Sequence, residues 1–149
     1  MRKLDNILFI GIGNNTRQDD GLGWCFIDEL EKLNVDEDIL IKKYQLMVEE
    51  ADLISNYETV FFIDASKNNL IKGYQITEVF PSEKVNFSTH EVPPNQIMNL
   101  CKTVYNKEPK AYLIEIQGFE WDFKIELTSK AQINLNLALN ELKESLNNN

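Results

Sequence analysis

The sequence is poor in the residues of nucleophilic and metal-cluster chemistry, with one histidine and two cysteines in 149 residues. Cys25 and Cys101 lie too far apart for a metal-ligand spacing or a disulfide framework. Each lies in an apolar pattern of helical spacing, so we expect buried thiols in a reducing compartment. A Ser-His-Asp or Cys-His arrangement would have to recruit His90, and none of the conceivable nucleophiles, Ser66, Ser88 or Cys25, lies in a nucleophile-elbow motif.

Basic residues and long apolar runs are also scarce. The chain has 15 Lys and Arg against 24 Asp and Glu, a net charge of −9. This charge would repel a polyanion, so nucleic acid is not an expected partner. No apolar run approaches the roughly 18 residues that span a bilayer, and the first residues show no signal-peptide pattern. We therefore expect a soluble, cytoplasmic protein that does not bind membranes.

The sequence that remains is typical of a globular domain, because 43% hydrophobic residues can fill a core. No internal repeat or linker interrupts it, so we expect residues 1–149 to form a single domain. Apolar patterns predict strands at 7–10, 39–44, 60–63, 74–80 and 111–116. They predict helices at 22–33, 48–57, 94–105 and 129–146. The apolar positions of the last helix are Ile133, Leu137, Leu139 and Leu142. Only the strand at 74–80 has the alternation of an edge or antiparallel strand. This order predicts a three-layer α/β/α fold with a twisted, mostly parallel (mixed) sheet of about five strands flanked by helices.

A glycine-containing segment, residues 11–23, follows the first strand directly. It does not match a dinucleotide fingerprint, because Thr16 occupies the position of the third small residue, and it lacks the Gly-Lys-Ser/Thr of a P-loop. It does place the carboxylates of Asp19 and Asp20 at the carboxyl end of a central strand, where open α/β sheets bind ligands. The alternative role for either aspartate alone is an N-cap of the helix that follows.

Two more side chains are expected at the same edge of the sheet. Asp64 follows the strand at 60–63, and His90 lies in the long irregular stretch 81–94. Two carboxylates and one imidazole form an incomplete coordination set, which is typical of catalytic or exchangeable metal sites. Turn or surface roles are the alternatives for each residue. A glycosidase pair of Asp20 with Asp64 also stays open.

In their order and spacing, these motifs resemble the hydrogenase maturation endopeptidases, which trim the C-terminus of the large subunit of [NiFe]-hydrogenases. The matching segments are residues 11–14, 19–23, 62–65, 88–91, 114–118 and 127–128. The resemblance implies that Asp20, Asp64 and His90 contact nickel, and these residues are also the best candidates for catalysis. Asn14, Asp19 and Thr89 are expected to contact the substrate.

The resemblance also implies a substrate and a reaction. The partner would be a nickel-loaded hydrogenase large-subunit precursor, which itself supplies the nickel, so we expect no tightly held cofactor. The enzyme, expected to be a monomer, would recognise this nickel and then remove a C-terminal extension by hydrolysis. Residues 15–18 and 72–73 depart from the family pattern, which affects the choice of substrate rather than the fold.

Two other functions remain as alternatives. A non-catalytic, metal-dependent binding protein could use the same fold and the same three residues. A peptidyl-tRNA hydrolase-like enzyme has a similar glycine-rich strand end, but the net charge of −9 and the missing early histidine disfavour it.

Overall fold

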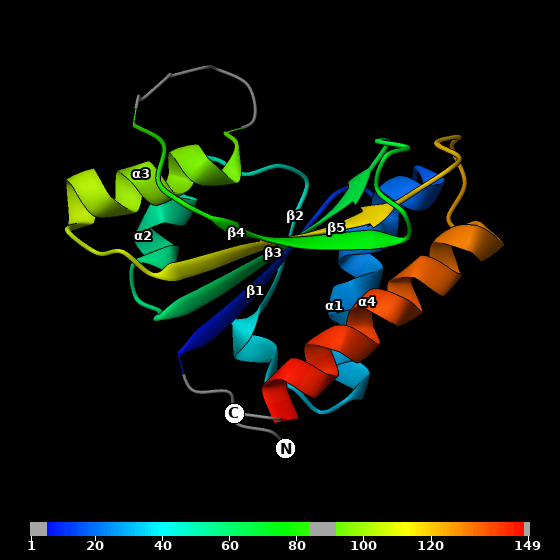
Figure 1. Cartoon of the computed structure of the whole chain (residues 1–149), viewed down its shortest axis with the longest axis horizontal. Helices are drawn as coiled ribbons and strands as arrows, with labels where there is room; N and C mark the ends of the chain where they lie inside the picture. The colour runs from blue at the N-terminus through cyan, green and yellow to red at the C-terminus, as the bar shows by residue number, and fades with distance from the viewer. Residues whose placement is uncertain (1–5, 84–91, 148–149) are drawn as a thin grey trace.

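A computed structural model of the chain describes residues 6–83 and 92–147 (Figure 1). The strands are β1 (Ile7–Ile12), β2 (Leu40–Lys43), β3 (Thr59–Ser66), β4 (Tyr74–Val79) and β5 (Lys110–Gln117). The helices are α1 (Leu22–Lys32), α2 (Glu50–Ile54), α3 (Pro94–Tyr105) and α4 (Ser129–Asn147), with short 3-10 helices η1 (Gln18–Gly21) and η2 (Glu37–Ile39).

The five strands form one mixed sheet in the order β2-β1-β3-β5-β4. β4 is antiparallel to β5, and the other neighbouring pairs are parallel. Helices α1 and α4 pack on one face of the sheet, and α2 and α3 pack on the other (Figure 1). The predicted three-layer α/β/α fold is confirmed, including the antiparallel edge strand.

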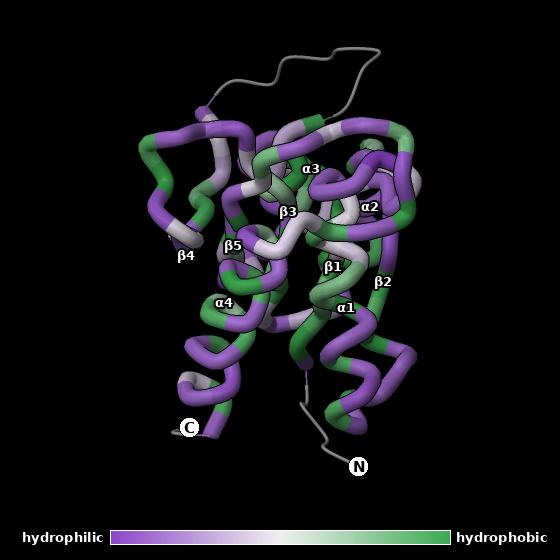
Figure 2. The backbone as a smooth tube through the Cα atoms, turned by 90° about the vertical axis from the view of Figure 1, so that its right-hand side faces the viewer, coloured by the Kyte–Doolittle hydropathy of each residue, from purple (hydrophilic) through white to green (hydrophobic). Residues whose placement is uncertain are grey.

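β1 is apolar along its whole length because both of its faces are covered. Leu8 and Ile10 belong to the core on the α2/α3 face, whereas Phe9 belongs to the core on the α1/α4 face. Figure 2 shows this hydrophobic strand flanked by helices whose turns alternate between hydrophobic and hydrophilic residues. A strand buried on both faces shows no alternation of polar and apolar residues, which is why its run of apolar residues indicated a parallel sheet.

Glycine allows the start of α1 to lie directly on the ends of β1 and β3. A Cβ atom added at Gly23 would lie 2.5 Å from the carbonyl oxygens of both Ile12 and Ile63. A Cβ at Gly11 would collide with the carbonyl oxygen of Gly23. This close packing holds η1, which immediately precedes α1, at the carboxyl edge of the sheet.

The sequence-based prediction was wrong about part of the buried face of α4. Ile133 and Leu137 were expected to be core residues, but they are 59% and 49% exposed. The buried positions are Ala131, Asn134, Leu135, Ala138, Leu139 and Leu142. Small alanines on this face let the helix approach the sheet closely, so the buried stripe does not coincide with the largest apolar side chains.

The chain's remaining elements follow the prediction with shifted ends. α2 is shorter than expected, and β3 runs through Asp64 to Ser66 because its pairing with β5 continues to Ser66 and Gln117. Both cysteines are free thiols, with Cys101 buried as expected and Cys25 only half-buried. Among the helices of the described residues, none has the length and apolar character needed to cross a membrane.

Candidate active site

The loop after β1 places Asp20 over the end of that strand. Gly13 has a φ of +145°, and a Cβ there would collide with the carbonyl oxygen of Asp20. The backbone N–H of Asn14 donates a hydrogen bond of 3.0 Å to the same oxygen. The carboxyl carbon of Asp20 lies 4.0 Å from where the Gly13 Cβ would be, so its side chain adjoins the end of β1.

Asp64 lies on the neighbouring strand at the same edge. The parallel register pairs Gly11 with Ile63, so Asp64 is next to Ile12, the last residue of β1. Phe62, two residues earlier, packs in the α2/α3 core, and the alternation of side chains places Asp64 on that same face. Asp20 and Asp64 therefore lie at adjoining strand ends, and both are half-buried.

The third residue of the expected set, His90, lies outside the described residues, as does Thr89. Among residues 6–83 and 92–147, no group of three His, Cys, Asp or Glu side chains is placed to hold a metal ion. The metal site of Asp20, Asp64 and His90 therefore stays a prediction. Hydrogen bonds hold the described residues on either side of the 84–91 segment. The N–H of Ser82 donates to the carbonyl of Asn95 at 3.0 Å, and the N–H of Val92 donates to the carbonyl of Leu46 at 3.0 Å.

Asp19 has a different environment from Asp20, although the two are adjacent in η1. Its side chain is fully buried, and both of its oxygens accept hydrogen bonds from the loop between β5 and α4. Oδ2 accepts from the N–H of Phe119 at 2.7 Å and of Glu120 at 3.1 Å. Oδ1 accepts from the N–H of Thr128 at 2.8 Å, and the Thr128 hydroxyl donates to Oδ2 at 2.8 Å. Asp19 thus fastens one loop of the carboxyl edge to another.

The N-cap position of α1 is not occupied by either aspartate. Gly21, which follows Asp20, is the N-cap residue. Asp19 supports α4 instead, since it binds Thr128, whose hydroxyl accepts from the N–H of Ala131 at 3.2 Å in the first turn of that helix. Asn14, like Asp19 a predicted substrate contact, accepts hydrogen bonds from the backbone and hydroxyl of Thr16. Substrate contact by Asn14 and Asp19 stays a prediction.

Other residues of the same two loops reinforce this junction, and the sequence analysis did not identify them. The Gln18 side-chain oxygen accepts from the N–H of Asp122 at 3.1 Å, and the Gln18 N–H donates to the Lys124 carbonyl at 2.9 Å. Arg17 donates from Nη2 to the carbonyl of Trp121 at 3.2 Å. These contacts join residues about 100 positions apart, so no local pattern in the sequence could have revealed them.

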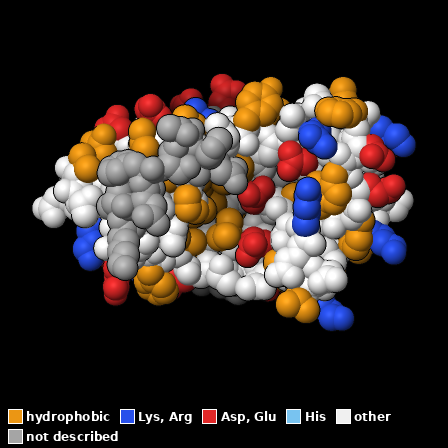
Figure 3. Space-filling view, turned by 90° about the horizontal axis from the view of Figure 1, so that it is seen from above, with side chains coloured by type: hydrophobic (Ala, Val, Ile, Leu, Met, Phe, Trp, Pro, Cys, Tyr) orange, Lys and Arg blue, Asp and Glu red, His pale blue; other side chains and the backbone are white. Residues whose placement is uncertain are grey.

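Seen from above, the molecule carries Asp and Glu side chains around a hollow near its centre (Figure 3). The right-hand part of this view shows hydrophobic side chains mixed with both basic and acidic ones. An acidic centre therefore adjoins a region of mixed charge with exposed apolar side chains on this side of the molecule.

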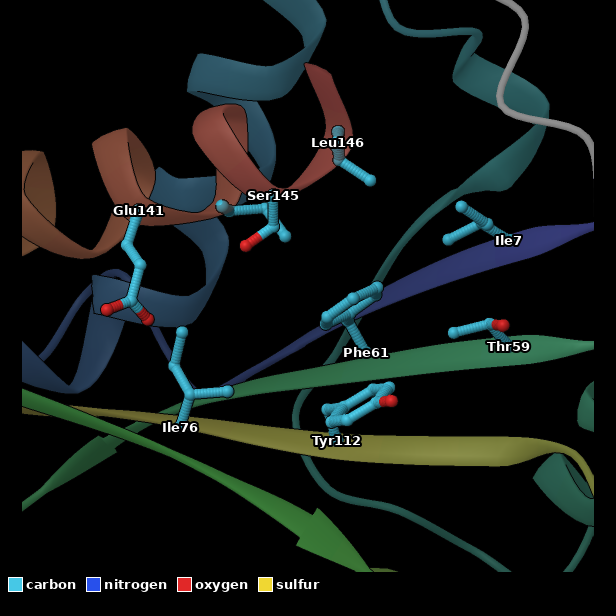
Figure 4. A pocket seen from close by; sticks show the side chains of 9 residues that line it. Ile7, Thr59, Phe61, Ile76, Tyr112, Glu141, Ser145 and Leu146 are labelled. Carbon is cyan, nitrogen blue, oxygen red and sulfur yellow. The ribbon is translucent and has the colours of Figure 1, made fainter. Parts of the chain in front are cut away.

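The described residues also form a pocket of about 330 Å3 between α4 and the sheet (Figure 4). Phe61 and Tyr112 lie side by side in it, with ring centroids 5.2 Å apart, and Glu141 projects toward it from α4. Its lining includes Ile7 and Thr59, the first residues of β1 and β3. The pocket thus lies toward the amino ends of these strands, away from Asp20 and Asp64.

Comparison with solved structures identifies the class of fold. The hydrogenase maturating endopeptidase HybD from E. coli superposes with a TM-score of 0.70 over 96% of this chain and 93% of its own, at 19% identity. The [NiFe] hydrogenase maturation protease HycI from Thermococcus kodakarensis gives a TM-score of 0.68 over 93% and 90% of the two chains, at 22% identity. At these identities the likeness establishes a shared fold.

Sequence comparison identifies the family. No family model matches the chain. A protein of Methanocaldococcus jannaschii whose name marks it as a hydrogenase maturation protease is 30% identical over 128 residues, which cover 81% of this chain and 80% of that protein. The chain belongs to the hydrogenase maturation protease family, as its motifs indicated, and it is a peptidase.

Proposed function

We propose that this peptidase removes a C-terminal extension from the precursor large subunit of a [NiFe]-hydrogenase after recognising the nickel bound in that precursor. The observation that carries the proposal is the position of Asp20 and Asp64 at adjoining strand ends in a chain of the hydrogenase maturation protease family. Open α/β sheets bind their ligands at this edge, between the loops that follow the strands.

The donor chemistry suits a nickel ion carried by the substrate. Two carboxylates and a neutral imidazole, from Asp20, Asp64 and His90, form a set that a borderline divalent cation accepts. Three protein ligands leave positions open for groups of the precursor, as in exchangeable sites. The nickel is therefore treated as part of the substrate and not as a resident cofactor.

The chain's own residues would then position the scissile peptide. A water molecule is the proposed nucleophile, oriented by one of the carboxylates or polarised by the metal of the precursor. Asn14 and Thr89 are proposed to contact the substrate, whereas the buried Asp19 is proposed to position the loop that it holds. On the basis of composition, we propose that the enzyme acts as a monomer in the cytoplasm.

The decisive experiment compares purified precursor with and without nickel as the substrate. Mass spectrometry should show loss of the extension only from the nickel-loaded precursor. Asp20→Asn, Asp64→Asn and His90→Ala should each slow processing by at least about 100-fold. The control is Glu108→Gln, which removes an exposed carboxylate paired with Lys102 and should leave the rate unchanged. Equal processing of both precursors would contradict nickel recognition, and normal rates in the three site variants would contradict the site.

Metal titration of the enzyme alone tests the site separately from the reaction. Binding of one Ni²⁺ or Cd²⁺ ion that each of the three substitutions weakens would support the three-residue set. Binding that none of them changes would leave Asp20 and Asp64 as structural carboxylates and would remove the basis for nickel recognition at this edge.

A further inference from the structure

The loop between β5 and α4 exposes an unusual amount of apolar surface. Phe123 is 80% exposed, Ile125 is 77% exposed and Phe119 is 38% exposed, and Trp121 between them is half-buried. We call these four residues, three aromatic and one aliphatic, the aromatic platform. Exposed apolar groups that gather within one segment, rather than occurring singly, mark surfaces that bind other molecules.

The backbone under the platform is firmly held. Asp19, Gln18 and Arg17 together bind the backbone at Phe119, Glu120, Trp121, Asp122, Lys124 and Thr128. A loop fixed in this way exposes its apolar side chains in the folded state itself, so partial unfolding does not account for their exposure. Because Asp19 precedes Asp20 directly, one short 3-10 helix supports both the platform and the candidate active site.

A cationic side chain lies over each of the three aromatic rings of the platform. Arg17 lies 4.7 Å from the ring centroid of Phe123. Lys67, from the loop after β3, lies 5.0 Å from that of Trp121, and Lys130 lies 5.6 Å from that of Phe119. Cation–π contacts of this kind keep the charged groups at the platform surface.

The platform is less acidic than the chain as a whole. Four basic side chains lie at the platform: Arg17, Lys67 and Lys130 over its rings and Lys124 within its segment. Four acidic side chains lie in or beside the same segment: Glu120, Asp122, Glu126 and Asp28, which lines a small hollow together with Ile125. The charges counted here balance, whereas the whole chain carries a net charge of −9. The rest of the molecule, which is strongly acidic, repels carboxylates. A partner segment that carries both apolar and acidic groups is complementary to the platform, because the platform offers apolar rings and cationic side chains.

We infer that the aromatic platform is the docking surface for the precursor large subunit, and that it receives a segment with an apolar side chain next to a carboxylate. This inference rests on the proposed function. The cut end of a folded precursor has to reach Asp20 and Asp64 while the body of the precursor stays outside the site. The platform belongs to the same carboxyl edge and is joined to Asp20 through η1, so a docked precursor is held in register with the site.

The test is a double variant, Phe123→Ser with Ile125→Ser, measured on the nickel-loaded precursor. Removing a central aromatic anchor from an interface commonly weakens binding by about tenfold or more. We expect KM and the directly measured Kd for the precursor to rise by at least about tenfold with kcat unchanged, because docking energy is separate from bond cleavage. The matched control is Val104→Ser, which removes an apolar side chain that is 64% exposed on α3, on the opposite face of the sheet, and should leave KM unchanged.

The outcomes separate failure of docking from failure of the proposed function. Normal KM and Kd in the double variant, together with normal processing by the wild type, would overturn the docking surface and leave the function intact. Binding without processing by the wild type, with binding lost in the double variant, would support docking and contradict the function. A wild-type chain that does not bind the precursor would overturn both. Concentration-dependent dimers that the double variant abolishes would show that a second copy occupies the platform, which also overturns this inference.

Discussion

The buried carboxylate of Asp19 offers the sharpest test of how this structure supports its site. In Asp19→Ala, three backbone N–H groups and the Thr128 hydroxyl lose their acceptor. An unsatisfied buried donor costs about 1–3 kcal/mol, and the exposed side of this loop can admit water, so the lower value applies to each. With four donors, we therefore expect Asp19→Ala to lower the free energy of unfolding by about 4 kcal/mol, out of the roughly 5–15 kcal/mol of a typical domain.

Asp19→Asn refines this prediction because it keeps the shape of the side chain. The new amide NH2 would face either the N–H groups of Phe119 and Glu120 or that of Thr128, and donors would then oppose donors. This variant should also lose about 2 kcal/mol or more. Urea unfolding measures the loss, and hydrogen exchange should quicken at residues 118–128 before any other segment. As a control, Asp28→Asn replaces a carboxylate whose side chain is 47% exposed, and it should change the free energy of unfolding by less than about 1 kcal/mol. An Asp19→Asn protein as stable as the wild type, with unchanged exchange in this loop, would refute the reasoning.

Three further predictions concern packing and the thiol. Gly23→Ala should cost about 2 kcal/mol in urea unfolding, because its Cβ would press on two backbone carbonyl oxygens at the ends of β1 and β3; wild-type stability would contradict the close packing of α1. Leu135→Ala should cost about 2–5 kcal/mol and Ile133→Ala less than about 0.5 kcal/mol, and the reverse order would mean that α4 presents the other face. Burial raises the pKa of the Cys101 thiol to about 11 from 9.0, so the unfolded chain loses this proton first. The free energy of unfolding should therefore fall as pH rises from 9 toward 11. Cys101→Ala should lack the contribution of this thiol to the fall while still processing precursor. Equal pH dependence of stability in both proteins would contradict the raised pKa of Cys101.

Local patterns in the sequence were sufficient for most of the fold. A strand covered on both faces is apolar throughout, as β1 is, whereas no residue of the edge strand β4 is fully buried. The helix predicted at 94–105 coincides with α3, whose N-cap is Pro93 and whose first residue is Pro94. The order of these elements, together with the motifs around Asp20 and Asp64, was also enough to indicate the family. Each of these signals lies within a few neighbouring residues, so one sequence suffices to detect it.

The tertiary structure alone decided the different environments of two adjacent carboxylates. Asp19 and Asp20 are the same residue type in the same short helix, but only Asp19 is fully buried, with hydrogen bonds to a loop about 100 positions later. The buried face of α4 was likewise set by how closely Ala131 and Ala138 let the helix approach its neighbours. The physical reason is the same in both cases. Periodicity and propensity are local properties of a chain, whereas burial and hydrogen-bond partners depend on which distant segments the packed sheet brings together.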